Sequence, residues 1–342
     1  MIEQFVHLSK YAGMREDLVQ AGGGNSSVKI DRKTMLVKAS GFQLAELTTQ
    51  SGYSTVDYVA ITEAFNGCAN IDALTEGDGK KILASAQKKG GKPSIETFLH
   101  AITSTFTIHT HPIVVNVLMA RKNAREIVEK IFPEAVFVPY ATPGINLAKA
   151  YFKAMKSQEL GPNKIVFLQN HGLVVSGEDE KDVIKVNEDV IYKIEDYLGL
   201  REKLAPYHIV TKIWDLFPEK VIWRVTDSNA FDVYKAKGLW KHQFCPDCIV
   251  FLAKKMWSPS NLDNYELNDF KSQYGEPVII EWEGNLYIVA ASVKKAMETQ
   301  SVLSFSAQVM SQVKEDDCNL LSDQEQNFLL HWDAEKYRQN IK

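Results

Sequence analysis

Two histidines separated by one residue are the clearest chemical feature of the sequence. His109 lies in the β-branched segment 106–110, and His111 follows it just before Pro112. On a β-strand, side chains two residues apart point to the same side, so both imidazoles can reach one point. Such a pair suits a divalent metal such as zinc, which catalytic sites hold with three protein ligands and one open position. The alternative is a pair of partly buried strand histidines that bind nothing.

A third histidine, His171, completes this ligand set. It lies in a Gln-Asn-His-Gly turn between two apolar strand patterns, 164–168 and 173–176. Ligand-binding residues are often found at such a strand end, although a turn histidine that only ends the strand has the same local sequence. With His109 and His111 it gives three ligands and leaves one position for substrate.

Glu96 is the candidate general acid or base. It follows Pro93-Ser94-Ile95, where Ser94 is the predicted N-cap of a helix over residues 95–104. A carboxylate in the first helical turn is favoured by the helix dipole, so an ordinary helix-start acid is the alternative interpretation. A metal-bound carbonyl acidifies the neighbouring carbon, and a carboxylate within reach can take that proton.

A run of three glycines predicts an anion-binding turn. Residues 22–27 read Gly-Gly-Gly-Asn-Ser-Ser, and Ser40-Gly41 follows a nearby strand pattern, with Lys38 as an electrostatic aid. Successive backbone N–H groups and small hydroxyls can bind phosphate or carboxylate. The run matches neither a P-loop nor a dinucleotide fingerprint, because no Gly-Lys-Ser/Thr follows and it leads from a helix into a strand. A helix C-cap with a tight turn is the alternative.

The segments that carry these residues alternate between helix and strand patterns. Helices are predicted at 2–20, 95–104, 114–130, 145–156 and 181–197, and strands at 26–30, 34–38, 56–61, 106–110, 135–139, 164–168 and 173–176. This interleaving predicts a mixed α/β fold in layers. Strand, strand and long helix recur at 278–281, 286–290 and 293–313, which echoes the order in 164–197 and indicates a degenerate second copy.

Composition and charge exclude several classes of function. The 342 residues are 45% hydrophobic and 24% charged, as in ordinary globular proteins. The net charge is −4 and no basic stripe occurs, so neither a nucleic-acid nor a membrane partner is expected. No signal-peptide pattern opens the chain, and four cysteines are too few for a disulfide scaffold, so we expect a reducing cytoplasm. The Cys245/Cys248 pair, half a zinc site or a redox pair by its spacing, is interpreted as reduced structural thiols.

Taken in order, the motifs resemble the class II aldolase/adducin family, which includes the zinc-dependent fuculose- and rhamnulose-phosphate aldolases. The matching elements are Gly-Gly-Asn25-Ser-Ser, Ser40-Gly41, Ser94-x-Glu96, His109-x-His111, Pro139-Tyr140-Ala-Thr and Asn170-His171-Gly172. The segments 245–248 and 332–337 further resemble the aldolase part of rhamnulose-phosphate aldolase/short-chain dehydrogenase fusions.

The resemblance implies a fold and an assembly. The fold is a three-layer α/β/α class II aldolase-like domain with a mostly antiparallel central sheet over residues 1–203. A smaller α/β C-terminal extension, interpreted as a degenerate repeat, covers residues 204–342. Family aldolases are usually cyclic tetramers with sites between subunits, so a homo-oligomer is expected here, with the tetramer favoured.

The resemblance also assigns roles to residues. His109, His111 and His171 correspond to the ligands of Zn²⁺, for which another divalent metal is the alternative. Glu96 corresponds to the catalytic acid/base. Tyr140 corresponds to a tyrosine that a neighbouring subunit offers to the reacting hydroxyl. The substrate- and phosphate-binding set is Asn25, Ser26, Ser40, Gly41 and Ser94.

The implied activity is that of a lyase acting on a small sugar or sugar phosphate. A ketose, such as rhamnulose or fuculose 1-phosphate, would be cleaved to dihydroxyacetone (phosphate) and an aldehyde through a metal-stabilised enediolate. Ile95 departs from the family pattern of two adjacent phosphate-binding serines, so the need for phosphate stays open. The alternatives are a sugar-phosphate 4-epimerase or dehydratase with the same metal chemistry, and a non-catalytic adducin-like interaction module.

Overall fold

The computed structural model describes residues 1–157, 165–238, 243–314 and 317–331. The chain divides into two compact units, Met1–Ala205 and Pro206–Lys342. The boundary predicted from the sequence lies between residues 203 and 204. The segment 332–337 that contributed to the resemblance lies outside the described residues, as does Lys164 of the strand predicted at 164–168.

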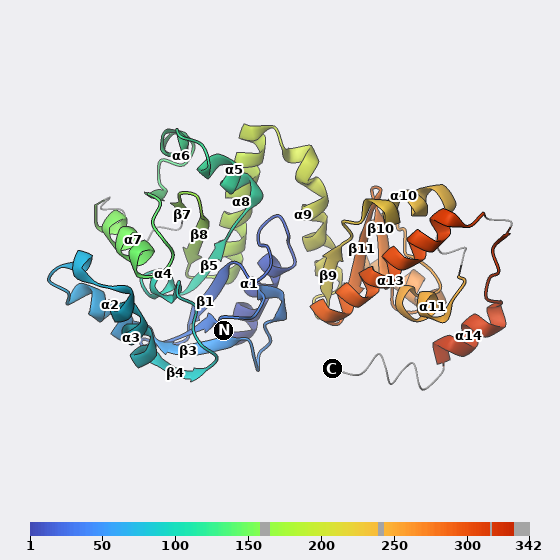
Figure 1. The fold of residues 1–342 in the computed structure, drawn as a ribbon, viewed down its shortest axis with the longest axis horizontal. Coiled ribbons are helices and arrows are strands. Elements are labelled where there is room, and N and C mark those ends of the chain that lie inside the picture. Colours follow the sequence, from blue (N-terminus) through green and yellow to red (C-terminus); the bar gives the residue numbers. More distant parts are fainter. Residues whose placement is uncertain (158–164, 239–242, 315–316, 332–342) are drawn as a thin grey trace. The chain divides into compact units, whose positions relative to one another are not determined.

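An eight-stranded sheet forms the centre of the first unit (Figure 1). Its order is β4-β3-β2-β1-β5-β8-β7-β6, and every neighbouring pair is antiparallel except β6 with β7. The strands are β1 (Asn25–Lys29), β2 (Thr34–Lys38), β3 (Tyr53–Asp57), β4 (Gln87–Gly90), β5 (Phe106–Thr110), β6 (Val136–Val138), β7 (Ile165–Leu168) and β8 (Gly172–Gly177).

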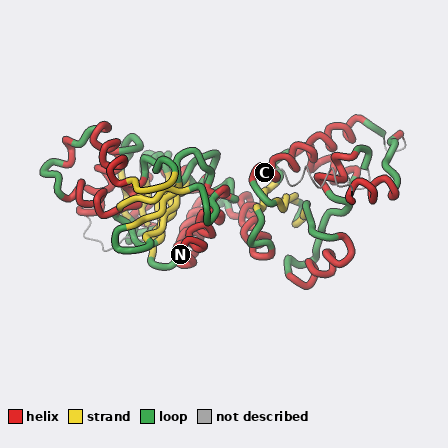
Figure 2. The backbone as a smooth tube through the Cα atoms, turned by 90° about the horizontal axis from the view of Figure 1, so that it is seen from below, coloured by secondary structure: helices red, strands yellow, loops and turns green. Residues whose placement is uncertain are grey.

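Helices cover both faces of this sheet, which gives three layers (Figures 1 and 2). One layer holds α2 (Tyr58–Asn66), α3 (Glu76–Ala86), α4 (Thr97–Ala101) and α7 (Ile145–Ser157), whose apolar side chains share a core with β2 and β3. The other holds α1 (Ile2–Gly13), α5 (Ile113–Met119) and α8 (Glu180–Leu198), with α6 (Ala124–Ile131) beside α5. The predicted α/β/α class with a mostly antiparallel sheet is confirmed.

Two neighbouring serines of β1 show how the faces are assigned. The hydroxyl of Ser26 contacts Ser9 of α1 at 2.7 Å, whereas the hydroxyl of Ser27 contacts His100 of α4 at 2.8 Å. Successive side chains of a strand point to opposite faces, so α1 and α4 belong to opposite layers. Every residue of β5 and β8 is buried, because these central strands are covered on both sides.

Several predicted element boundaries are wrong. The helix predicted at 2–20 ends at Gly13, where a Cβ would lie 2.1 Å from the backbone nitrogen of Ala45 in the short helix η1 (Leu44–Glu46). The strand predicted at 56–61 ends at Asp57, whose carboxylate caps α2 by accepting from the N–H of Ala60. The helical pattern at 114–130 forms two helices, α5 and α6. The basic loop predicted at 88–92 contributes to β4.

The second unit is built on a three-stranded antiparallel sheet. Its order is β10-β11-β9, with β9 (Val221–Arg224), β10 (Ile279–Trp282) and β11 (Asn285–Ala290). Its helices are α10 (Ser228–Lys237), α11 (Pro246–Leu252), α12 (Asn264–Tyr274), α13 (Val293–Gln312) and α14 (Asp323–His331); α9 (Arg201–Leu216) contains the boundary. The hairpin β10-β11 followed by α13 has the local order of β7, β8 and α8. That the unit is a second copy stays a prediction.

The structure also bears on the cysteine pair and on membrane-spanning helices. Cys245 and Cys248 are free thiols whose sulfur atoms lie 3.3 Å apart. Within the described ranges, no helix combines the length and the apolar character that crossing a bilayer requires.

Candidate metal centre

The three predicted histidines converge on one point. Nε2 of His109 lies 3.1 Å from Nε2 of His111 and 3.3 Å from Nε2 of His171. Within the part of the chain that the structure describes, these three residues are the one group of metal-ligating side chains that could hold an ion, with all ligand atoms within 4.8 Å of one another. His171 reaches the pair because β8 lies beside β5, with Leu173 paired to Thr110.

Tight packing around Gly172 shapes the turn that carries His171. A Cβ at Gly172 would lie 2.2 Å from the carbonyl oxygen of Thr110 and 3.1 Å from the ring of His111. Asn170, two residues earlier, has a φ of +53°, a left-handed conformation that asparagine tolerates better than most residues. The backbone of this turn therefore favours Asn170 and Gly172 for steric reasons, in addition to the chemical role of His171.

The protonation of the histidines fits a metal. A carbonyl oxygen only accepts hydrogen bonds, so the 2.9 Å contact with Leu173 means that Nδ1 of His109 donates and Nε2 keeps its lone pair. Burial lowers the pKa of His109 and lowers the pKa of His111 to about 3, so both rings are neutral at pH 7. Neutral imidazole is the form that binds metal.

The spacing of the nitrogens fits as well. A tetrahedral ion with metal–nitrogen bonds of about 2.0–2.1 Å separates its ligands by roughly 3.3 Å. The two nitrogen–nitrogen distances at His109, 3.1 and 3.3 Å, are close to this value. Imidazole donors suit zinc and neighbouring transition metals better than magnesium or calcium. The residues present therefore fit a divalent transition-metal ion.

Glu96 lies directly beside the histidines. Its Oε1 is 3.0 Å from Nε2 of His171, its Oε2 is 3.7 Å from Nε2 of His109, and Oε2 accepts a hydrogen bond from the amide of Asn25 at 2.5 Å. Burial raises the pKa of Glu96, but two other effects outweigh it: the positive charge that His109 gains when it is protonated at low pH, and the hydrogen bond with His171. The pKa of Glu96 therefore lies below its ordinary value. Glu96 is therefore an ionised carboxylate able to exchange a proton next to the histidine cluster.

The helix start at Glu96 differs from the prediction. Ser94 is not the N-cap, because α4 begins at Thr97 and Glu96 itself occupies the N-cap position without a side-chain capping bond. The hydroxyl of Ser94 instead accepts from the N–H of Glu96 at 3.3 Å. The carboxylate is thus free to point at the histidines. Sequence reasoning also placed Asn25 with the phosphate, whereas its amide holds Glu96.

Two predicted anion-binding loops lie side by side. The backbone N–H of Ser40 donates to the carbonyl of Lys92 at 2.8 Å, and Ala39 forms a β-bridge with Pro93. This pairing brings Ser40-Gly41 next to the segment that carries Ser94. Ile95 in that segment is half exposed.

Lys38 joins these loops to the glycine run. Its ammonium donates to the carbonyl of Phe42 at 2.7 Å and to that of Gly22 at 3.3 Å. Burial lowers the pKa of Lys38, and the nearby carboxylates Glu96 and Glu46 partly offset that effect. Lys38 thus places a positive charge where the predicted anion-binding segments meet.

Two predicted site residues lie apart from the others. The hydroxyl of Ser26 faces α1 and contacts Ser9, on the opposite face of the sheet from Asn25, so the structure does not bring it to the site. Tyr140 is 57% exposed. Its backbone N–H donates to Gln169 at 3.2 Å, which places its loop beside the turn of His171. Its phenol makes no hydrogen bond with any residue that the structure describes.

Replacing Gly23 by alanine is expected to weaken metal binding, because a Cβ there would lie 2.9 Å from both Nδ1 of His111 and the carbonyl oxygen of Gln20. Overpacking of this kind costs about 1–3 kcal/mol, and part of that strain falls on the ligand. The neighbouring Gly22→Ala is the matched control, since a Cβ at Gly22 meets nothing within 4 Å. Thermal unfolding and zinc titration of both variants would check this; equal behaviour would contradict it.

Residues 3–198 match the family model described as the class II aldolase and adducin N-terminal domain. The curated protein YuxG of Bacillus subtilis, named an uncharacterized oxidoreductase, is 28% identical in an alignment of 214 residues, and the match covers 58% of this chain and 30% of YuxG. The chain therefore spans about a third of that relative.

Solved structures are similar over a comparable share of the chain. An N-terminal class II aldolase domain of a conserved Thermoplasma acidophilum protein is 27% identical, with a TM-score of 0.50, and covers 57% of this chain and 92% of its own. A sugar-phosphate aldolase from Thermotoga maritima is 17% identical, with a TM-score of 0.41, and covers 59% of this chain and 94% of its own.

Proposed function

Because this chain belongs to the class II aldolase and adducin family, we propose that it is a zinc-dependent aldolase. It cleaves a ketose, or a ketose 1-phosphate, to dihydroxyacetone or its phosphate and an aldehyde. The observation that carries the proposal is the convergence of three histidine nitrogens next to an ionised carboxylate. A protein-interaction module of the same fold has no need for a metal-ligand set beside a buried acid.

The three histidines hold the ion, and the Leu173 carbonyl keeps His109 in the tautomer that binds it. When bound, a divalent cation polarises the substrate carbonyl and stabilises the negative charge that develops during the reaction. Zinc is proposed as the ion because all three protein ligands are imidazoles.

Glu96 moves the proton. In the condensation direction its carboxylate accepts a proton from the carbon next to the substrate carbonyl. In cleavage the substrate hydroxyl loses its proton as the carbon–carbon bond breaks, and Glu96, after taking up one proton, delivers it to that carbon. Asn25 holds Oε2 of Glu96, which orients the carboxylate toward the histidines. A depressed pKa keeps Glu96 ionised and ready to act as a base at neutral pH.

Ser40, Gly41, Ser94 and Tyr140 bind and orient the substrate. The loops of Ser40-Gly41 and Ser94, with the ammonium of Lys38 bound to the carbonyl of Phe42 next to the first loop, receive a phosphate or another anionic end. The exposed phenol of Tyr140 serves the reacting hydroxyl of a substrate bound by a neighbouring subunit of a homotetramer. A cytoplasmic location stays a prediction.

The sequence resemblance indicates which substrates to try first. The similarity to a relative named an oxidoreductase, of which this chain spans 30%, agrees with the resemblance to the aldolase part of rhamnulose-phosphate aldolase/dehydrogenase fusions. We therefore propose rhamnulose 1-phosphate and fuculose 1-phosphate as first candidates. The free ketoses belong beside them, because Ile95 provides no hydroxyl for phosphate.

A retro-aldol screen tests the function. Purified protein, stripped with a chelator and reloaded with zinc, is incubated with ketoses and their 1-phosphates, and products are identified by NMR. Zinc-dependent release of a three-carbon ketone and an aldehyde is the expected result. An epimer would instead assign a 4-epimerase and loss of water a dehydratase. A protein that binds no divalent ion would contradict the proposal and favour an interaction module.

A further inference from the structure

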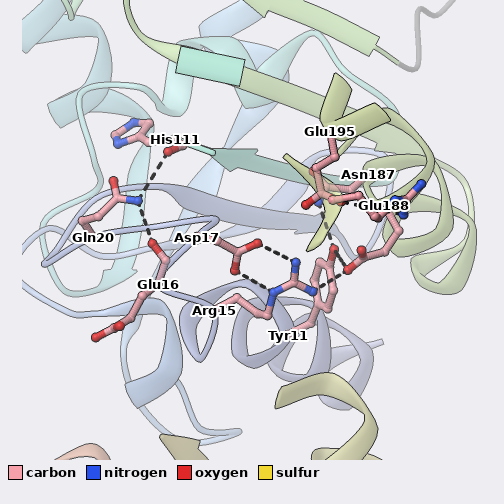
Figure 3. A network of polar contacts seen from close by, with 10 residues as sticks. Tyr11, Arg15, Glu16, Asp17, Gln20, His111, Asn187, Glu188 and Glu195 are labelled. Carbon is pink, nitrogen blue, oxygen red and sulfur yellow. Dashed lines mark hydrogen bonds and ion pairs between the residues drawn. The ribbon is translucent and has the colours of Figure 1, made fainter. Parts of the chain in front are cut away.

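A buried ionic cluster connects the end of α1 with α8, and the proposed mechanism does not use it (Figure 3). The guanidinium of Arg15 is fully buried. It donates to both carboxylate oxygens of Asp17, at 2.7 and 2.6 Å, and to Oε1 of Glu188 at 2.8 Å. The phenol of Tyr11 donates to the same oxygen of Glu188 at 2.7 Å and accepts from the amide of Asn187 at 2.9 Å.

This cluster fixes the backbone that follows α1. Both ends of the Arg15–Asp17 pair lie in one short turn, and Glu188 ties that turn to a long helix of the same layer. Bidentate contact between a guanidinium and a carboxylate is geometrically specific as well as strong. Removing Arg15 would leave the carboxylates of Asp17 and Glu188 without their shared cation, and removing Glu188 would release the tie to α8, so we expect the turn to shift when the cluster is incomplete.

The backbone of His111 is hydrogen-bonded to this same turn. The N–H of His111 donates to the carbonyl of Leu18, and the N–H of Ile113 donates to the carbonyl of Asp17, both at 2.8 Å. The amide of Gln20 donates to the carbonyl of Glu16 at 2.9 Å and to that of His111 at 3.5 Å (Figure 3).

His111 needs this support because it lies beyond the sheet. The last pair between β5 and β8 is Thr110 with Leu173, so strand pairing holds His109 but ends one residue before His111. The backbone hydrogen bond that a strand neighbour would supply to His111 comes instead from Leu18. The position of one metal ligand therefore depends on the turn, and the turn depends on the ionic cluster.

We propose that Arg15, Asp17 and Glu188 are positioning residues for His111, which set the affinity and the coordination geometry of the metal centre without touching metal or substrate. This inference rests on the metal centre proposed above. It assigns to a charged cluster in the layer of α1 and α8 a role in the site at the end of β5.

Glu188→Gln and Arg15→Lys test this role. Each keeps much of the side-chain shape but removes a charge or the bidentate contact. Zinc affinity, measured by competition with a chromogenic chelator, is expected to fall about 10–100-fold, as when outer-shell partners of metal ligands are replaced. The absorption bands of the Co²⁺-loaded protein should change with the altered coordination. The matched control is Glu180→Gln, which removes a buried carboxylate of the same helix that contacts His7.

The outcomes separate this inference from the proposed function. If the wild-type chain binds no metal, the proposed centre itself fails. If the wild-type chain binds zinc, and Glu188→Gln has a lower Tm but the same zinc affinity and the same Co²⁺ spectrum, the cluster serves stability alone and this inference is overturned. Should circular dichroism show that Glu188→Gln is unfolded, Tyr11→Phe replaces it. That variant removes one hydrogen bond to Glu188 and is expected to weaken zinc binding about threefold; unchanged affinity would again overturn the inference.

Discussion

Replacing His109 by alanine is expected to remove the metal and abolish carbon–carbon bond cleavage. His109 is fully buried and lies between the other two ligands, at 3.1 and 3.3 Å. Loss of even an outer-shell partner weakens metal binding about 10–100-fold, so loss of a ligand should exceed that. A Lewis acid contributes several kcal/mol to the barrier, which predicts a fall in kcat of roughly 10³-fold or more.

The measurement for His109→Ala is metal content by mass spectrometry together with turnover on the best substrate of the screen. His100→Gln is the matched control, because His100 is equally buried in the same unit but contacts Ser27 instead of the cluster. The control should retain about one ion per chain. An alanine variant that binds zinc as tightly as the wild-type protein would show that the three histidines are not the ligands.

Changing Glu96 to glutamine should separate proton transfer from metal binding. The carboxamide has the same shape and can still accept a hydrogen bond from Asn25, but it cannot exchange a proton with substrate. We therefore expect metal content to persist while kcat falls about 10²–10⁴-fold, the usual contribution of a positioned general acid or base.

A partial reaction gives the sharper readout for Glu96. In D₂O, the wild-type enzyme should exchange one proton of dihydroxyacetone phosphate, or of dihydroxyacetone, without any aldehyde present, and NMR follows that exchange. Glu96→Gln should lose the exchange, whereas Glu180→Gln, which removes a buried carboxylate elsewhere, should keep it. Wild-type exchange by the glutamine variant would assign the proton transfer to another group.

The sequence alone predicts those features of this protein that depend on residues close together in the chain. The strand patterns at 34–38 and 106–110 coincide with β2 and β5, because β-branched and apolar residues there alternate or run without interruption between turn residues. The spacing of His109 and His111 already places both rings on one side of β5. The ordered motifs were enough to indicate the family.

Other features were decided by packing between distant segments. Local periodicity could not show that the helix predicted at 2–20 ends at Gly13, or that the backbone of Ala45 packs directly against this residue. It could not show which of Asn25 and Ser26 faces Glu96, since that depends on which layer covers each face of β1. Nor could it show the start of α4: the sequence predicts Glu96 inside this helix, but Glu96 precedes its first residue, Thr97.

The candidate site depends both on the local sequence and on the tertiary structure. Residue types and order identified three imidazoles and a carboxylate, because few other side chains offer metal-binding nitrogens and exchangeable protons at neutral pH. Their convergence required the pairing of β5 with β8, which brings His171 to His109 across 62 residues of sequence. It also required the buried turn at Arg15, which holds His111 one residue beyond the sheet. Strand register and the burial of a charged cluster are set by contacts between segments far apart in the chain, and no local sequence pattern contains them.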